Sequence, residues 1–258
     1  MNRIDKLFGQ KKNGIFSVYL TAGYPNSNDT VNTIVELASH GIDMIEIGIP
    51  FSDPMADGVV IQKSSTVALN NGMTIRKLFA QLQDIRSQVE IPLVMMSYLN
   101  PIMQYGIDNF CRSCVETGID GMIIPDLPFA DYMQKLKPIV EKYGLHCIML
   151  ISPETSDERI RLIDENTSGF IYMVSSASTT GAKEYFDEQT IDYFKRVNAM
   201  NLQNPRMIGF GLSNSVTFNA AAKHAAGGII GSAFIRLLGE SASIKEAVEN
   251  LIAKIRME

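Results

Sequence analysis

The chain has few of the side chains that most often bind metals or act as catalytic bases. Only three of its 258 residues are histidines: His40, His146 and His224. His146 alone lies next to an expected strand, at the amino end. In barrels of parallel strands that end serves stability, and catalysis takes place at the other end. A histidine-ligated metal site and a Ser-His-Asp triad are therefore both disfavoured.

Cysteines are equally sparse, with only Cys111, Cys114 and Cys147. An odd, small set does not form a disulfide framework, so we expect a reducing compartment, the cytoplasm. The spacing of Cys111 and Cys114 occurs in redox and zinc sites. Here it falls in a helical stretch, 108–117, and no second pair completes a tetrahedral site. We interpret the pair as two ordinary helix residues.

The sequence also lacks the features of membrane and nucleic-acid proteins. No apolar run is long enough to span a bilayer. The segment 1–12 carries four basic residues, but the apolar region of a secretion signal does not follow it. Its pattern predicts a short amphipathic helix instead. A net charge of −5 argues against a nucleic-acid surface. We expect neither a membrane nor a nucleic acid as partner.

What the chain does have is a regular alternation of apolar runs and amphipathic segments. Runs rich in Ile, Val, Leu and Met are typical of parallel strands buried on both faces. We expect strands at 17–22, 44–48, 93–97, 121–125, 147–151, 170–174, 207–211 and 228–231. Helical periodicity indicates helices at 30–40, 75–89, 132–143, 158–165, 190–200, 215–225 and 244–255.

Eightfold alternation of strand and helix predicts an α/β fold, closed as a (β/α)8 TIM barrel with an extra N-terminal helix. An open doubly wound sheet is the alternative, but the chain has no obvious dinucleotide-binding fingerprint. No linker interrupts the chain, so we expect one domain, 1–258. The second and third strands start 49 residues apart and the sixth and seventh 37, against 21 to 28 for most. This spacing predicts long loops after strands 2 and 6, at the catalytic end.

Glu46 is the first candidate for catalysis, because it stands in the middle of an apolar strand. Side chains alternate across a strand, so Glu46 shares a face with Met44 and Gly48, while Ile45 and Ile47 take the other. If the isoleucines pack on the helices, Glu46 points into the barrel. Apolar surroundings raise the pKa of a carboxyl group, which suits a general acid or base. A buried Glu satisfied by a neighbouring hydroxyl group is the structural alternative.

The loop after this strand adds two carboxylates, Asp53 and Asp57. Both stand in pairs common in turns, Asp-Pro and Asp-Gly, so turn formation alone could explain them. Beside Glu46, one of them is a candidate second acid or polar anchor.

Glycine-rich turns follow the last three strands, around 179–182, 209–213 and 231–233. Backbone N–H groups and helix N-termini bind phosphate, and barrels often do so after strands 7 and 8. The turns therefore indicate a phosphate site, although the sequence of a P-loop is absent. No lysine lies in an expected strand, which disfavours a Schiff-base aldolase. The residues together predict acid–base chemistry on a phosphorylated substrate.

These motifs resemble the tryptophan synthase alpha subunit family over essentially the whole chain. The matching stretches are 19–25, 45–58, 124–128, 209–211 and 231–233, and 45–58 is the most specific. The resemblance implies a lyase that cleaves indole-3-glycerol phosphate to indole and glyceraldehyde 3-phosphate. It implies Glu46 as general acid/base, Asp57 as the carboxylate that holds the indole N–H, and Tyr172 as an aromatic hydroxyl group near Glu46.

The resemblance also implies binding positions. Those for phosphate are Gly181, Phe210, Gly211, Gly231 and Ser232. Those for the indole pocket are Tyr19, Ile61, Met96 and Tyr98, and Thr180 matches a loop that closes over the site. At 176 and 178 the chain has Ser where the family often has Arg and Gly, and Ser at 178 removes backbone freedom from that loop.

The family resemblance further implies no cofactor in this chain. It implies a pyridoxal-phosphate beta subunit as partner, in an alpha2-beta2 heterotetramer, with the loop around Asp53 facing that partner. Two alternatives stay open. The first is another phosphosugar barrel. An isomerase would be expected to have an acid at the end of strand 1, and an indole-glycerol-phosphate synthase would be expected to have a lysine at a strand end. A non-catalytic activating subunit would be expected to lack Glu46 or Asp57.

Overall fold

The strands of the protein close into a parallel barrel. The computed structural model describes residues 1–175 and 185–256. Within them, each strand pairs with the next along the chain and β8 pairs with β1. The strands are β1 (Ile15–Thr21), β2 (Met44–Gly48), β3 (Leu93–Met96), β4 (Gly121–Ile123), β5 (His146–Ile151), β6 (Ile171–Val174), β7 (Arg206–Gly209) and β8 (Gly227–Ile230). The TIM barrel is confirmed, and no strand end differs from its predicted place by more than two residues.

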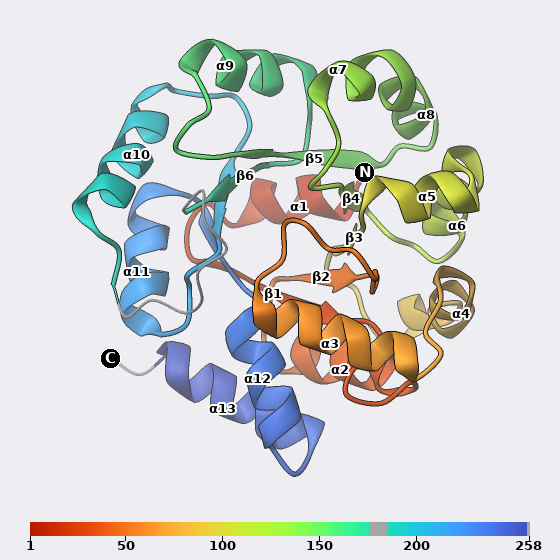
Figure 1. Ribbon diagram of the computed structural model, residues 1–258. Helices are drawn as coiled ribbons and strands as arrows, with labels where there is room; N and C mark the ends of the chain where they lie inside the picture. Colours follow the sequence, from red (N-terminus) through yellow and green to blue (C-terminus); the bar gives the residue numbers. More distant parts are fainter. Residues whose placement is uncertain (176–184, 257–258) are drawn as a thin grey trace.

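Helices surround the barrel (Figure 1). They are α1 (Arg3–Gln10), α2 (Asp29–Ser39), α3 (Val59–Asn70), α4 (Ile75–Gln81), α5 (Leu99–Tyr105), α6 (Ile107–Glu116), α7 (Phe129–Asp131), α8 (Lys137–Lys142), α9 (Asp157–Asn166), α10 (Glu188–Ala199), α11 (Ser215–His224), α12 (Ser232–Glu240) and α13 (Ile244–Arg256). A 3-10 turn at Ile85–Ser87 and a π-helical turn at Tyr132–Leu136 interrupt the regular pattern. None of the described helices is long and apolar enough to cross a membrane.

Three helical predictions need correction. The helix expected at 75–89 ends at Gln81, and Ser87 instead bonds the carbonyl group of Asp84 through both its backbone N–H and its hydroxyl group. The helix expected at 132–143 is a composite, because Pro138 supplies no N–H and a π-helical turn precedes it. Much of the length assigned to a loop after strand 2 forms α3.

Strand register places Glu46 inside the barrel, as predicted. In the β1–β2 pair Tyr19 lies opposite Glu46 and Thr21 opposite Gly48. Paired residues of parallel strands point to the same side of the sheet. The interior is therefore lined by every second residue of each strand, while Ile45 and Ile47 pack on the helices.

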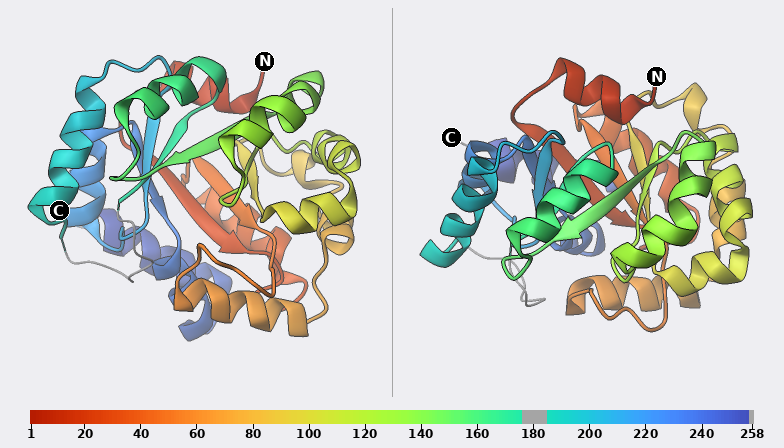
Figure 2. Two further views of the ribbon diagram at one scale, coloured as in Figure 1. Left: turned by 45° about the horizontal axis from the view of Figure 1, so that its top comes forward. Right: turned by 90° about the horizontal axis from the view of Figure 1, so that it is seen from above.

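Helix α1 covers the end of the barrel where the strands begin, opposite α3 (Figure 2). The buried carboxylate of Asp120, which precedes β4, binds the guanidinium groups of Arg3 at 3.0 Å and Arg86 at 2.7 Å. It also accepts the backbone N–H of Leu93 at 3.0 Å. Asp120 thus joins helix α1 to the starts of β3 and β4.

We expect Asp120→Ala to destabilise the fold by about 3–5 kcal/mol, because it leaves two arginines without their buried partner. Urea unfolding followed by circular dichroism measures the change in free energy. Asp108→Ala is the matched control, since Asp108 pairs with Lys142 in an exposed position and its loss should change little. Equal effects of both substitutions would contradict the role of the Asp120 network.

Candidate active site

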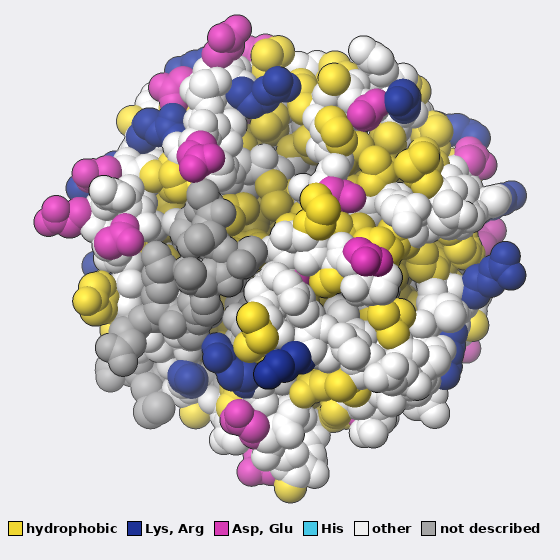
Figure 3. Space-filling model, viewed as in Figure 1, with side chains coloured by type: hydrophobic (Ala, Val, Ile, Leu, Met, Phe, Trp, Pro, Cys, Tyr) yellow, Lys and Arg dark blue, Asp and Glu magenta, His cyan; other side chains and the backbone are white. Residues whose placement is uncertain are grey.

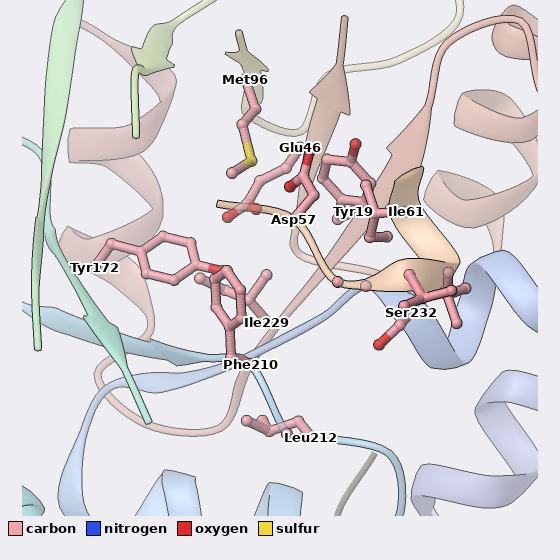
Figure 4. A pocket seen from close by; sticks show the side chains of 15 residues that line it. Tyr19, Glu46, Asp57, Ile61, Met96, Tyr172, Phe210, Leu212, Ile229 and Ser232 are labelled. Carbon is pink, nitrogen blue, oxygen red and sulfur yellow. The ribbon is translucent and has the colours of Figure 1, made fainter. Parts of the chain in front are cut away.

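The carboxyl ends of the strands surround a cavity of about 420 Å³. Its lining comes from six strands or the turns after them and from the start of α3: Tyr19, Glu46, Asp57, Gly58, Val59, Val60, Ile61, Met96, Tyr172, Phe210, Gly211, Leu212, Ile229, Gly231 and Ser232. Figure 4 shows the carboxyl groups of Glu46 and Asp57 between Met96, Tyr19 and Tyr172. The cavity lies where barrels carry their active sites.

Glu46 is completely buried, and neither of its carboxyl oxygens has a hydrogen-bond partner among the described residues. Burial raises the pKa of Glu46 to about 8. The charged form of a carboxyl group is disfavoured where neither water nor a donor stabilises it. At neutral pH the group therefore carries its proton, as required of a general acid.

Asp57 lies in a different environment, in the loop between β2 and α3. Burial raises its pKa to about 6, and a hydrogen bond from the hydroxyl group of Tyr98 opposes the rise. The same hydroxyl group accepts the backbone N–H of Ala56 at 2.9 Å. Tyr98 thus fixes the loop and favours the ionised form of Asp57, so that at neutral pH one cavity holds a protonated and an ionised carboxyl group.

Two tyrosine rings reach across the barrel interior because glycines make room for them. A Cβ atom at Gly48 would lie 2.0 Å from the hydroxyl oxygen of Tyr19, and one at Gly209 would lie 2.1 Å from that of Tyr172. Burial raises the pKa of Tyr172 well above its usual range, and the neighbouring Glu46 adds to this. Both phenols therefore keep their protons and can donate hydrogen bonds.

The opposite side of the cavity adds backbone groups of the turns after β7 and β8 to the side chains of Phe210, Leu212 and Ile229. Phe210 and Gly211 have positive φ angles of 65° and 74°, and the carbonyl group of Phe210 accepts a hydrogen bond from Ser175 at 2.8 Å. After β8, Gly231 precedes α12 and Ser232 is its first residue. The N–H groups of the first turn of a helix have no partner within the helix, so this side suits an anion.

Most residues singled out from the sequence meet in this cavity. Tyr98 and Asp53 are the exceptions: Tyr98 bonds Asp57 and Ala56 instead of lining the cavity, and Asp53 is exposed outside it. Thr180, Gly181, Ser176 and Ser178 lie outside the described residues. Sequence reasoning assigned no role to the lining residues Gly58, Val59, Val60, Leu212 and Ile229. Ile229 could have been found, since it stands two residues before Gly231 and points the same way; the others depend on the path of α3 and of the turn after β7.

Fold and site together define the class of the protein, a TIM barrel with two carboxyl groups in a cavity at the carboxyl ends of its strands. The family model described as tryptophan synthase alpha chain matches residues 6–258. A tryptophan synthase alpha chain from Parabacteroides distasonis is 61% identical over 99% of this chain and 100% of that protein. One from Bacteroides fragilis is 58% identical over 100% and 98%.

Solved structures of tryptophan synthase are also similar to this chain. Tryptophan synthase subunit alpha from Legionella pneumophila superimposes with a TM-score of 0.89 at 34% identity, covering 99% of this chain and 97% of the other. A chain of the tryptophan synthase complex from Pyrococcus furiosus gives 0.84 at 32% identity, covering 95% and 98%. The chain belongs to the tryptophan synthase alpha chain family, which cleaves indole-3-glycerol phosphate in tryptophan biosynthesis. Membership of this family rules out the two alternatives of an isomerase and an indole-glycerol-phosphate synthase.

We expect Tyr98→Phe to raise the pKa of Asp57 above its value of about 6, because the ionised carboxylate loses a donor. Titration of 13C-labelled aspartate by NMR measures the shift. Tyr105→Phe is the control, since the Tyr105 hydroxyl group bonds Ser113 on α6, at a distance from the cavity. An Asp57 pKa that is the same in both variants would contradict the hydrogen bond.

Proposed function

We propose that this chain is a lyase that cleaves indole-3-glycerol phosphate to indole and glyceraldehyde 3-phosphate, with Glu46 and Asp57 as its catalytic carboxyl groups. The observation that carries the proposal is the pair of carboxyl groups in one cavity with pKa values of about 8 and about 6. Unequal environments assign unequal roles to two carboxyl groups.

In the proposed reaction, Glu46 donates its proton to the indole ring carbon that bears the glycerol side chain. The ring nitrogen becomes positively charged, and ionised Asp57 accepts its N–H and stabilises that charge. The bond from the ring to the side chain then breaks, and its electron pair returns to the ring. The adjacent hydroxyl group becomes the carbonyl group of the aldehyde and gives its proton back to the Glu46 carboxylate. The acid is thereby regenerated without a cofactor.

The remaining lining residues are proposed to position the substrate. Tyr19, Ile61 and Met96 form the wall for the indole ring, and Tyr98 holds Asp57 toward the ring nitrogen. The Tyr172 hydroxyl group lies on the other side of Glu46. Phe210, Gly211, Gly231 and Ser232 provide the backbone for the phosphate group, so that binding at one end orients the reacting carbon at the other. Gly181 as a phosphate ligand and Thr180 in a closing loop remain predictions from the sequence.

We further propose that the chain pairs with a beta subunit in an alpha2-beta2 heterotetramer, with pyridoxal phosphate bound by that partner and not by this chain. A tryptophan synthase complex is among the similar structures. Met55, Val59 and Met103 are 85%, 65% and 58% exposed, and apolar side chains are frequent on the face that contains the cavity (Figure 3). Such a face suits a protein partner. The buried, unpaired thiols fit a cytoplasmic enzyme.

Indole release from indole-3-glycerol phosphate by the purified chain tests the catalytic assignment. Because Glu46 acts protonated and Asp57 acts ionised, we expect the rate to be highest between about pH 6 and 8 and to fall on either side. Glu46→Gln should lower the rate by about 100-fold to 10,000-fold, the usual contribution of general acid catalysis. Asp57→Asn should cause a large loss and abolish the acid limb of the remaining activity.

Asp53→Asn is the matched control for the isolated chain, since it changes an exposed carboxylate in the same loop, outside the cavity. Addition of a beta subunit should stimulate release by the wild type, whereas a non-catalytic activating subunit would release no indole alone. Wild-type rates in the Glu46→Gln variant would contradict its role, and no release by the folded wild type would refute the proposed reaction.

A further inference from the structure

We propose that Lys63 on α3 and Arg236 on α12 form a cationic pair that attracts and holds the phosphate group of the substrate from outside the cavity. The inference rests on the proposed function for the presence of a phosphorylated substrate. It adds side-chain charge to a site that so far consists of backbone N–H groups and one serine.

The two residues occupy equivalent places on neighbouring helices. Lys63 follows Val59 by four residues and Val60 by three, and both valines line the cavity at the start of α3. Arg236 follows Ser232 by four residues, and Ser232 lines the cavity at the start of α12. Residues three and four apart lie on the same face of a helix. Each cation therefore lies one turn behind the part of its helix that contacts the cavity.

Helix geometry turns both side chains toward the cavity. Every Cα–Cβ bond in an α-helix is tilted toward the N-terminus, so a long side chain covers the preceding turn. For Lys63 and Arg236 that turn is the cavity wall. The two helices pack against each other, and Figure 3 shows Lys and Arg side chains gathered over the adjoining ends of α3 and α12.

Neither cation is neutralised by a neighbour that the structure describes. Within the described part of the chain, Lys63 and Arg236 form no ion pair and no hydrogen bond, whereas Lys11, Arg86 and Lys142 each bind an aspartate. Helix α3 contains no acidic residue. Glu240, one turn beyond Arg236 on α12, lies farther from the cavity and does not pair with it. Among the residues of 1–175 and 185–256, none competes with an anion for either positive charge.

The two positive charges oppose the repulsion between a negatively charged protein and a negatively charged substrate. The net charge of the protein is −5, and a phosphate monoester has about two negative charges near neutral pH. A local positive field at the mouth of a cavity concentrates anions there despite an unfavourable overall charge. The backbone N–H groups then hold the phosphate at short range, and the cationic pair supplies the attraction at longer range.

The test compares Lys63→Gln, Arg236→Gln and the double variant with wild type in two measurements. The first is the KM and kcat for indole-3-glycerol phosphate, and the second is calorimetric binding of glyceraldehyde 3-phosphate, which needs no turnover. We expect each substitution to raise KM and the dissociation constant by about threefold to tenfold. The double variant should also show a weaker dependence of affinity on salt, because fewer charges remain to be screened.

Lys254→Gln is the charge-matched control. Lys254 is exposed on α13, and Arg256, two residues on, bonds the carbonyl group of Gly41 before β2, at the opposite end of the barrel. Dephosphorylated indole-3-glycerol is the control ligand, because its binding should be insensitive to the cationic pair. Unchanged affinity and salt dependence in the double variant would overturn the proposal. If wild type binds glyceraldehyde 3-phosphate with the expected dependence on Lys63 and Arg236 but releases no indole, the proposed function fails and the cationic pair stands.

Discussion

The burial of an unpaired carboxyl group sets the conditions for the rest of the site. Glu46 stands in a strand whose neighbours on both sides are strands of the same barrel, so the backbone cannot yield to let water reach it. No described donor compensates for the lost hydration. This position is unfavourable for a charged side chain, and the consequence is a proton that Glu46 retains at neutral pH and can donate to a substrate. An ion pair in the same place would have stabilised the charged form and removed the acid.

The contrast between Glu46 and Asp57 follows from the path of the chain. Both lie in one short stretch, but Glu46 belongs to a strand and Asp57 to the loop after it, where water and Tyr98 are within reach. Tyr98 comes from the loop after the adjacent strand and bonds both the backbone and the side chain of this stretch. The distance between the two carboxyl groups thus depends on a contact between neighbouring loops, and the strands on which those loops stand provide the rigid base.

The barrel and the orientation of Glu46 were predictable because they depend on local rules. A parallel strand buried on both faces is a continuous apolar run, and strict alternation decides which face each side chain takes. Helix α3 was missed because its apolar and polar residues are not separated into clear faces, and it begins with two β-branched valines. The bond from Tyr98 to Asp57 joins two loops, and no pattern within either loop indicates it. The assignment of residues to indole and phosphate came from the family resemblance, and it remains a proposal that the arrangement of the cavity supports.

Helix α1 has a further consequence for how the molecule is made. Arg3 and the carboxylate that it binds, Asp120, are separated by 117 residues, and His146, whose Nε2 lies 2.8 Å from the carboxylate of Asp5, is farther still. A ribosome makes these residues in order, so the first helix leaves the exit tunnel long before its binding surface exists. Its apolar face, with Ile4 and Phe8 buried in the finished protein, stays without a native partner until more than half of the barrel has been synthesised. That end of the barrel can therefore be closed only after the strands that carry the partners of α1 have been made.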